Sequence, residues 1–419
     1  MSDVASGAAN AGAETAVRIG YFAIVWKELR KNRVAIFGIW CIFGLCLIAI
    51  YAPLLSFNQP IFVSIDGTWS LPLFSALFNR LLFENSVDIF FNLLLVLSPL
   101  YVAIYGLAKR RSGPRFAEVR FRVVGWLSVV HLIVLCTLLP AHLGSVENPL
   151  HRSSAVVSYA DQVAGARASG KAVSVVYPIH RYGYRDTNPS ESVVGPSAKH
   201  FLGTDTEGRD VFARMLFGTR ISLTIGVVAV AIYVAIGVVL GALAGYYGGA
   251  IDGLISRFIE VMICFPSFFL ILTLAALIEQ RSIFHVMIII GITSWTGVAR
   301  LVRAEFLKHR ELEYAQAARA LGIPTRRIIF AHILPNAMAP VLVSATFGIA
   351  SAILIESSLS FLGIGDLTVA SWGETLNTGR LEGKLWLILA PGFAIFFVVT
   401  VFNLVGEGLR DALDPKLRS

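Results

Sequence analysis

Asp205 and Asp210 are the residues of this chain best placed to act as a pair of acid–base carboxylates. They lie close together in the segment TDTEGRD, with Arg209 between them. Paired carboxylates do such chemistry when they face a nucleophile, a bound metal or a substrate. The neighbouring sequence offers no nucleophile and no set of metal ligands. Helix capping and a local ion pair are therefore the favoured interpretation, and a membrane-bound hydrolase or transferase is the enzyme alternative.

The same segment also predicts where a helix begins. Thr204 and Glu207 have the spacing of a capping box, and Asp205 is itself a good N-cap residue. We therefore expect a surface helix to start at this point, ahead of the next apolar run.

A second motif, GARASGK, matches the first seven positions of a phosphate-binding loop, GxxxxGK, from Gly165 to Lys171. The eighth position is Ala172, which lacks the hydroxyl that binds magnesium in such loops. The following residues, VSVVY, predict a strand, whereas a phosphate-binding loop opens a helix. We therefore expect no nucleotide site here, and ATP must bind another chain if it drives this protein.

Ionisable residues inside the apolar runs are few, and the clearest are Glu260 and Glu356. Such residues normally face protein or water, and they support a second alternative, a proton-coupled secondary transporter. Glu260 can instead pair with Arg257, and a proton relay normally uses more groups than these. The histidines lack metal-ligand spacing and the cysteines form no CxxC. We expect no catalytic residue, metal site or cofactor in the chain itself.

The elements that must position these residues are mostly membrane spans. Of 419 residues, 56% are hydrophobic and 15% are charged, and the mean hydropathy is +0.71. Several apolar runs reach the length of about 18 residues that a bilayer crossing requires. The net charge of +8 comes largely from Lys and Arg beside the spans, which is typical of cytoplasmic flanks. No basic patch with interleaved aromatics is present, so we expect contact with membrane lipid and no binding of nucleic acid.

The apolar runs predict an all-α polytopic membrane protein of about eight spans. The predicted segments are a cytoplasmic N-terminal tail with an amphipathic helix (1–33), a first span (34–52), an extracytoplasmic connection (53–88), a transmembrane hairpin (89–139), an extracytoplasmic segment (140–203), a core region (204–405) and a cytoplasmic tail (406–419). Within the core region the spans are expected at 221–245, 254–278, 284–298, 337–359 and 385–405. Pro53 should end the first span, and Pro266 should kink the second span of the core, at 254–278. Both termini are expected in the cytoplasm.

Three glycines recur every four residues in the span at 221–245, at Gly237, Gly241 and Gly245. In lipid, small residues at this spacing let two helix backbones approach closely. This face is therefore expected to pack on another helix, which belongs either to this chain or to a partner.

Residues 300–340 form the longest charged run between apolar segments and predict a pair of short helices on the cytoplasmic side. The first helix is rich in alanine, and Gly322 followed by Pro324 should end it. Thr325 can cap a second helix that leads through Pro335 into the next span. An ordinary cytoplasmic loop is the simpler interpretation of the same run.

Several of these segments together resemble the permease subunits of ATP-binding-cassette importers, specifically the C-type permease of the dipeptide, oligopeptide and nickel group. The resemblance rests on six segments in the family's order: HFLGTDTEGRDVFARMLFGTRISL, GYYGGAIDGLISRFIEVMICFPS, EYAQAARALGIPTRRIIFAHILPN, LIESSLSFLGIG, SWGETL and FNLVGEGLRDALDP. It implies a type I importer permease core of about six spans. The hairpin at 89–139 and the long segment after it would then be additions, expected to form a peripheral unit that contacts a binding protein or a neighbouring subunit.

The resemblance also assigns a role to residues 300–336, which correspond to the family's coupling region. The family signature reads Glu-Ala-Ala, three residues, Gly, nine residues, then Ile-x-Leu-Pro; here Gln316 replaces its Glu and His332 replaces its Ile. In the family this helix docks in a groove of the ATPase subunit. The residues implied for coupling and ATPase docking are Glu313, Gln316, Ala317, Ala318, Arg319, Gly322, Arg326, Arg327, Leu334 and Pro335. The small alanines would allow a close fit, and the arginines would pair with acidic groups of the partner.

As a member of such a system, the chain would be the membrane-spanning subunit of an ATP-driven importer for short peptides or related solutes. The implied partners are a second homologous permease, two ATPase subunits that bind ATP and magnesium, and an extracytoplasmic solute-binding protein. The implied location is the bacterial inner membrane, and the implied mechanism is alternating access. The sequence leaves the transported solute open.

Overall fold

The computed structural model describes residues 21–79, 82–113, 116–143, 159–279, 281–366 and 368–413. Residues 1–20 of the predicted N-terminal tail, residues 144–158 and residues 414–419 of the C-terminal tail lie outside this part. Six helices are long and apolar enough to cross a membrane, and the number of spans rises to eight if two bent helix pairs each count as one. The prediction of an all-α polytopic fold with about eight spans is confirmed.

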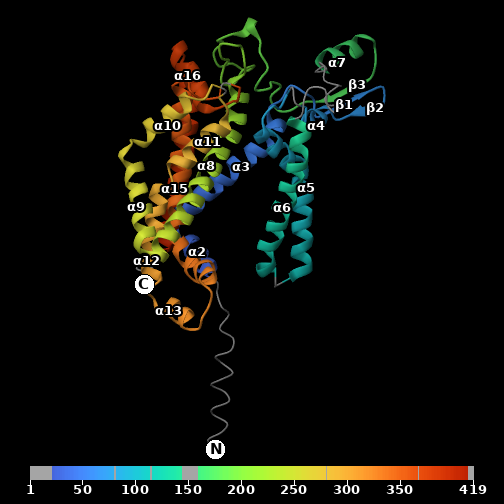
Figure 1. The fold of residues 1–419 in the computed structure, drawn as a ribbon. Helices are drawn as coiled ribbons and strands as arrows, with labels where there is room; N and C mark the ends of the chain where they lie inside the picture. The colour runs from blue at the N-terminus through green and yellow to red at the C-terminus, as the bar shows by residue number, and fades with distance from the viewer. Residues whose placement is uncertain are drawn as a thin grey trace, which may run out of the picture.

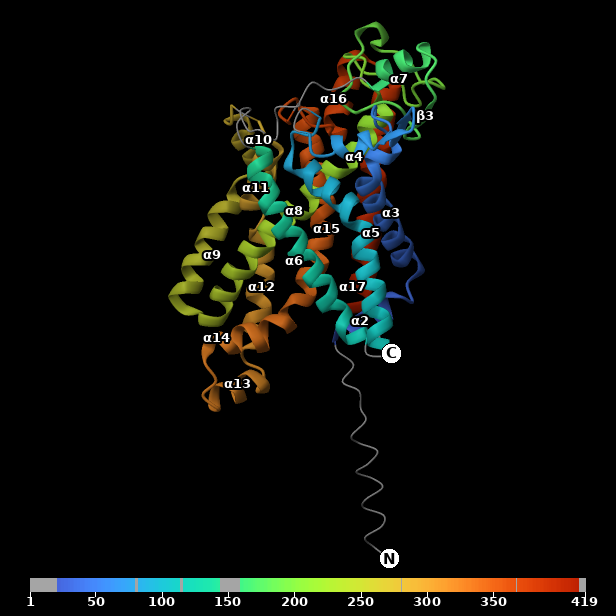
Figure 2. The same ribbon diagram turned by 90° about the vertical axis from the view of Figure 1, so that its right-hand side faces the viewer.

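The core is built around one long helix, α8 (Val211–Tyr247), which contacts most of the other core helices. These are α3 (Arg33–Leu55), the bent pairs α9 (Gly249–Cys264) with α10 (Ser267–Ala276) and α11 (Ile283–Thr293) with α12 (Thr296–His309), then α15 (Leu334–Phe361), α16 (Trp372–Glu382) and α17 (Leu385–Leu413). Figure 2 shows α15 running along the core between α12 and α17. The short α2 (Tyr21–Leu29) packs on α17.

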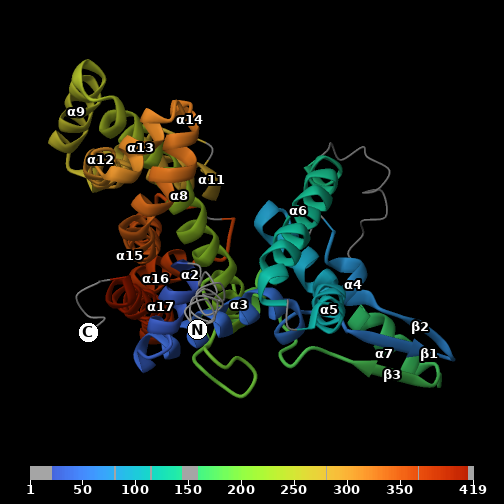
Figure 3. The same cartoon turned by 90° about the horizontal axis from the view of Figure 1, so that it is seen from below.

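A helical hairpin, α5 (Ser86–Ser112) and α6 (Phe116–Leu143), stands beside this core. It is attached through α5, which contacts α3 and α8. Seen from below in Figure 3, the hairpin is well separated from α9 and α12. Only a small share of α6 is buried, so its apolar surface is open over most of its length.

The two ends of the molecule differ in structure (Figure 1). One end, here called the sheet end, carries α4 (Pro72–Ala76), α7 (Tyr159–Ala168), a short 3-10 helix (Pro189–Glu191) and a three-stranded sheet. The sheet has the order β2-β1-β3, with β1 (Phe62–Ile65) between β2 (Thr68–Ser70) and β3 (Val173–Val176). Both pairings are antiparallel, and Phe62 faces Val176. The opposite end, the α13 end, carries α2 and the short α13 (Glu313–Ala320).

The sheet joins two connections that are far apart in the sequence. β1 and β2 precede the hairpin, whereas β3 follows it, so the two predicted connections fold together as one unit at the sheet end. The strand predicted from VSVVY is confirmed. Its pairing with residues 62–65 could not be read from spacing, because the hairpin lies between them.

The prediction for the helix start near Thr204 is wrong, because α8 begins only at Val211. Asp210 is its N-cap, and its Oδ1 accepts the backbone N–H of Ala213 at 2.8 Å. The hydroxyl of Thr204 instead donates to the carbonyl of Glu191 at 2.6 Å, and Gly208 turns the chain with a φ of +72°. A residue at positive φ cannot continue a right-handed helix, so the capping-box pattern marks a turn here.

The prediction that Pro53 ends the first span is also wrong, since α3 continues through it to Leu55. Pro266 has the predicted effect, because it lies at the break between α9 and α10, whose axes differ by 78°. The span predicted at 284–298 breaks at residues 294–295 with a bend of 40°, and its second half, α12, runs on to His309. Val302 and Phe306 are buried on one face of α12, and this packing holds a charged stretch in a helix.

The glycine stripe of α8 packs against α12 of the same chain. A Cβ built on Gly237 would lie 2.7 Å from a Val298 carbon, and one on Gly241 would lie 2.5 Å from the Ala299 carbonyl oxygen. One on Gly245 would lie 2.6 Å from the Arg303 carbonyl oxygen. The two backbones therefore approach too closely for any side chain, which makes α8 and α12 a rigid pair.

Candidate functional site

α13 is a short helix with clear ends. Glu313 lies in its first turn and Arg319 in its last, so both charges are favourable to the helix dipole. Beyond its end, the N–H of Gly322 bonds to the Arg319 carbonyl at 2.9 Å, and the N–H of Ile323 bonds to the Ala318 carbonyl at 3.1 Å. These bonds form a Schellman motif with Gly322 at a φ of +69°. The helix stop predicted at Gly322 is confirmed.

The two faces of α13 have different surroundings. Ala315 and Ala318 are buried and belong to the same hydrophobic cluster as Ile328, Ile329 and Ile333. Glu313, Gln316, Ala317 and Arg319 are exposed. Ala318 was predicted to fit against a partner, but its side chain is used for packing within the chain; Ala317 is the alanine of that pair which faces outward.

The return from α13 to the membrane passes through an unusual helical turn. α14 (Thr325–Arg327) is preceded by Pro324, which takes the N-cap position predicted for Thr325. It runs into a π-helical turn, η4 (Ile328–Ile333), which continues directly into α15. Half-buried Leu334 and exposed Pro335 begin α15. A proline has no N–H to donate, so it suits the point where the hydrogen-bond spacing changes from π to α.

Arginines tie this segment to the end of α8. Arg310 donates from Nη1 to the carbonyls of Gly245 at 3.0 Å and Tyr246 at 3.4 Å. The guanidinium of Arg319 lies over the Tyr246 ring, 5.3 Å from its centroid. Arg303 in α12 donates from Nη2 to Asp252 of α9 at 2.7 Å. Arg310 and Arg319 thus hold α13 and the residues before it to the end of α8, and Arg303 joins α12 to α9.

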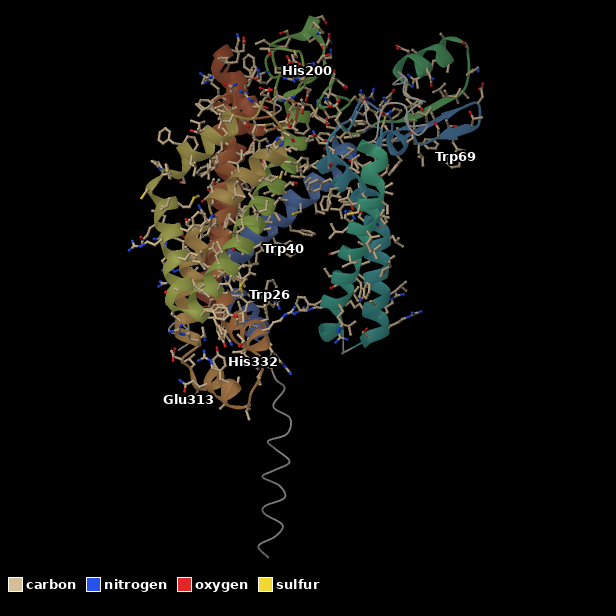
Figure 4. The ribbon with its side chains drawn as sticks, in the orientation of Figure 1. Trp26, Trp40, Trp69, His200, Glu313 and His332 are labelled. Atoms are coloured by element: carbon tan, nitrogen blue, oxygen red, sulfur yellow. The ribbon has the colours of Figure 1, made fainter. Side chains whose placement is uncertain are left out.

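The outer surface around α13 combines cations with exposed apolar side chains. Leu321 is 80% exposed and Phe330 is 61% exposed. Beside Phe330, exposed Arg326 and Arg327 line a hollow of about 490 Å³. Figure 4 shows Glu313 at the tip of this end and His332 closer to the spans. Large apolar groups framed by cations on an exposed surface are typical of a protein-binding site.

At the sheet end, the side chains of the predicted cluster Asp205, Arg209 and Asp210 are used for structural hydrogen bonds. Asp205 accepts the Nε–H of Arg209 at 2.7 Å and the backbone N–H groups of Glu207 and Arg209 at 2.9 Å each. With Asp210 engaged as the cap of α8, both carboxylates are occupied by local contacts. This geometry favours the capping interpretation over a catalytic pair.

Sequence reasoning missed two further members of this cluster, Arg214 and Glu374. Arg214 of α8 pairs with Glu374 in the first turn of α16, and Arg209 Nη2 lies 3.5 Å from the same carboxylate. This contact joins the segments TDTEGRDVFAR and SWGETL, which are far apart in the sequence. A buried arginine needs an acid nearby, and SWGETL supplies one, but no spacing rule connects the two segments.

Two histidines surround Asp210 from the other side. The Nε2 atom of His180 and the Nδ1 atom of His200 lie 2.9 Å and 2.8 Å from Asp210 Oδ2. His200 Nε2 lies 3.3 Å from Glu191, which also pairs with Lys199. The hydrogen bond from Lys199 lowers the pKa of Glu191. These contacts hold the loop before α8 against the start of that helix.

A third buried cluster attaches the hairpin to the core. The Arg220 side chain is completely buried and donates to the Ala49 carbonyl at 2.7 Å and to Asp88 at 3.0 Å. Asp88 also accepts the hydroxyl of Tyr184 at 3.0 Å, and the Phe217 ring lies under the guanidinium. One arginine thereby joins α3, α5 and α8.

Comparison with known proteins identifies the family. The family model described as the binding-protein-dependent transport system inner membrane component matches residues 237–419, and the N-terminal TM domain of oligopeptide transport permease C matches residues 20–67. The dipeptide transport system permease protein DppC of Alkalihalophilus pseudofirmus is 45% identical over 239 residues, which cover 56% of this chain and 78% of the relative. The chain belongs to the binding-protein-dependent transport permeases.

Other relatives place this permease in the same group. The oligopeptide transport system permease protein OppC of Haemophilus influenzae is 41% identical over 240 residues, covering 56% of this chain and 77% of that protein. The glutathione transport system permease protein GsiD of Pectobacterium atrosepticum is 41% identical over 228 residues, covering 54% and 75%. The expected C-type permease of the peptide group of ABC transporters is confirmed, and with it a multi-pass inner-membrane protein.

Within the permease, the two intramembrane glutamates have ordinary partners. Glu260 Oε2 accepts from Arg257 at 2.7 Å on an exposed helix face. Glu356 is buried in α15 and accepts the hydroxyl of Ser360 at 2.8 Å. Neither glutamate contacts the other clusters described above. The two therefore do not form the relay that a proton-coupled carrier would need.

Proposed function

We propose that this permease is the membrane-spanning subunit of an ATP-driven importer and that α13 transmits the movement of partner ATPases to the spans. The observation that supports this most directly is the arrangement of α13: its inner face is fastened to the chain and its outer face is open. A helix bound in this way moves together with α12 and α15 when a partner moves it. The small outer residue Ala317 allows a partner surface to come close.

The arginines of this segment would select the partner by matching acidic residues on its surface. Arg326 and Arg327 stand beside exposed Phe330, so a docking groove with acidic residues around an apolar pocket would match this surface. ATP and magnesium would be bound by the two ATPase subunits and not by this chain. A second homologous permease and an extracytoplasmic solute-binding protein would complete the transporter, and alternating access would carry short peptides, or related solutes such as those named for its relatives, inward.

The same proposal fixes the orientation in the membrane. The α13 end would lie in the cytoplasm with both termini, and the sheet end would lie outside. The hairpin α5–α6 and the sheet would form the predicted peripheral unit, held to the core by Arg220 and open toward lipid on α6. The unit would contact the binding protein or a neighbouring subunit.

The docking surface is tested with an Ala317→Trp variant purified together with its partner subunits. A bulky ring on the outer face of α13 would keep the ATPases from seating, so we expect loss of the co-purified ATPases and of ATP-dependent peptide uptake. Ala103→Trp, at an exposed position of the hairpin, is the matched control and should retain both. Full uptake by Ala317→Trp with normally bound ATPases would refute the docking assignment.

Gly322, which ends α13, offers a second and independent test of the coupling role. Gly322→Pro cannot adopt a φ of +69°, so the end of α13 would be rebuilt and coupling lost. Ala318→Glu would instead bury a charge inside the chain. A loss of uptake in this variant would therefore indicate misfolding of this segment and not a loss of docking.

A further inference from the structure

One face of α15 borders open space along almost the whole helix. The residues that line this space follow one helical stripe, spaced three and four apart, from Asn336 to Ile355. At about 1.5 Å per residue the stripe is about 28 Å long, close to the hydrocarbon thickness of a bilayer. Two cavities in line over this length, here together called the groove, are oriented as a path across the membrane.

The groove consists of two cavities that meet at Ser344 and Phe347. The cavity nearer the α13 end has a volume of about 570 Å³ and lies between α12, α15 and α17. The deeper cavity has a volume of about 280 Å³ and lies between α8, α11 and α15. Ser344 and Phe347 line both, so the two spaces adjoin at these residues.

The deeper cavity is neutral and lined with hydroxyl groups. Tyr233 of α8, Ser344 and Ser351 of α15, and Ser294 at the break between α11 and α12 contribute them. In the described part of the chain, the hydroxyls of Tyr233, Ser294 and Ser344 have no hydrogen-bond partner. Hydroxyl groups within a membrane span normally face a protein partner or water, so these groups are available to a ligand.

Phe347 lies at the boundary between the cavities and Tyr233 lines the deeper one, and both rings rest on glycines. Phe347 lies against Gly406 of α17, where a Cβ would come within 2.9 Å of the ring. Tyr233 of α8 reaches Gly348 so closely that a Cβ there would overlap its hydroxyl oxygen. A side chain at either glycine would clash with the aromatic residue that rests on it. Phe347 is therefore held at the narrow point by the backbones around it.

The charges of the wider cavity distinguish between possible occupants. Glu305, Lys308 and Arg410 line it, so both signs are present at its mouth. A helix from a neighbouring subunit would fit the small residues of the stripe, but it would also have to match charges of both signs at the wider cavity. A short peptide has a main chain that bonds to neutral hydroxyls whatever its side chains, and it carries one charge of each sign at its ends.

We propose that this groove is the inner part of the peptide path, with the hydroxyls of Tyr233, Ser294, Ser344 and Ser351 serving the peptide main chain and Phe347 as its constriction. The proposal rests on the importer function above and specifies where the cargo passes in this subunit.

The complete transporter, with Cys41, Cys46, Cys136 and Cys264 of this chain replaced by alanine, is labelled in inverted membrane vesicles, where the α13 end faces the reagent. It is then reconstituted into liposomes with enclosed ATP, in which uptake is measured. Ser344→Cys and Ser351→Cys are each treated with a cationic, membrane-impermeant methanethiosulfonate reagent. Thr346→Cys is the matched control, because Thr346 lies on α15 but lines neither cavity. We expect both groove positions to react about tenfold or more faster than the control, since a thiol in a water-filled cavity ionises and reacts, whereas one that faces lipid does not.

Two further readouts separate a path from a mere crevice. Labelling at Ser344→Cys or Ser351→Cys should abolish ATP-dependent uptake of trialanine, and labelling of Thr346→Cys should not. Adding Phe347→Ala should speed the reaction of Ser351→Cys and leave that of Ser344→Cys unchanged, because only Ser351 lies beyond the constriction.

Absence of labelling at both groove positions, with and without ATP, would show that a neighbouring helix covers the groove and would overturn the proposal. Labelling that leaves uptake intact would overturn it as well. The cysteine-free transporter separates the importer function from the assignment of the groove. Lack of ATP-dependent uptake by the cysteine-free transporter contradicts the importer function, whereas the labelling pattern tests the groove.

Discussion

At the scale of single residues, the most consequential contacts of this permease are buried ion pairs near the sheet end. Arg214–Glu374 and Arg220–Asp88 each join helices that are distant in sequence. Removing one member leaves the other charge without compensation in a medium that solvates it poorly. The sequence contained these residues, but they stand just outside the apolar runs and look like ordinary flanking charges.

Asp88→Ala tests this directly. The variant leaves Arg220 buried without its carboxylate, and we expect a destabilisation of about 3–5 kcal/mol, seen as a lower midpoint of thermal unfolding in detergent. Asp88→Leu combined with Arg220→Met removes both charges and should recover most of the loss. Equal stability of the single variant and the native protein would show that the pair does not hold the hairpin.

At the scale of elements, close packing of α8 and α12 turns the span region and α13 into one mechanical unit. Gly237, Gly241 and Gly245 bring the two backbones together, and Arg310 closes the end of α8. Movement of α13 therefore reaches α8 without a flexible joint. The π-helical turn at Ile328–Ile333 is the irregular point on the other side of α13.

Gly241→Leu is expected to separate this pair. The new side chain would meet the Ala299 carbonyl and Val302, and overpacking of this kind costs about 1–3 kcal/mol. Thermal unfolding in detergent measures the loss of stability. ATP-dependent uptake should fall by more than the decrease in folded protein accounts for, because the coupling between α12 and α8 is weakened. Gly253→Leu is the matched control, because space around Gly253 is open. A loss as large in the control would count against a specific contact.

At the scale of the whole molecule, the chain divides into a permease core and a unit made of the hairpin and the sheet. The hairpin α5–α6 lies outside the two regions that the family models match, whereas β1 lies inside one of them. The two rival functions lose support at this scale. Glu260 and Glu356 have separate local partners, and Asp205 and Asp210 serve turns and a helix cap. Both observations agree with the proposal that partner ATPases supply the energy for transport.

The proton-coupled alternative makes a different prediction for uptake. In vesicles with the complete transporter and constant ATP, a protonophore should leave peptide uptake unchanged, and Glu260→Gln should do the same because Glu260 is paired with Arg257 on an exposed face. Uptake that collapses with the protonophore, or that proceeds with this chain alone, would favour the secondary transporter.

The sequence predicted the roles of some site residues correctly and those of others incorrectly. The stop at Gly322 was predictable because glycine at a helix end acts locally. The start of α8 was not, since Thr204 had a competing partner, Glu191, from a distant loop. The outward face of α13 was assigned incorrectly at Ala318, because alanine suits a close contact on either side of a helix and spacing alone does not say which.

The sequence by itself determined the class of protein, the spans, the C-type permease family and the position of α13, because hydropathy, helix-stop residues and ordered motifs act over short distances. Only the tertiary structure decided which helix covers the glycine stripe, which acids meet Arg214 and Arg220, and where a groove opens along α15. Those contacts join residues separated by whole spans, and their partners are selected by packing in three dimensions, which no local pattern encodes.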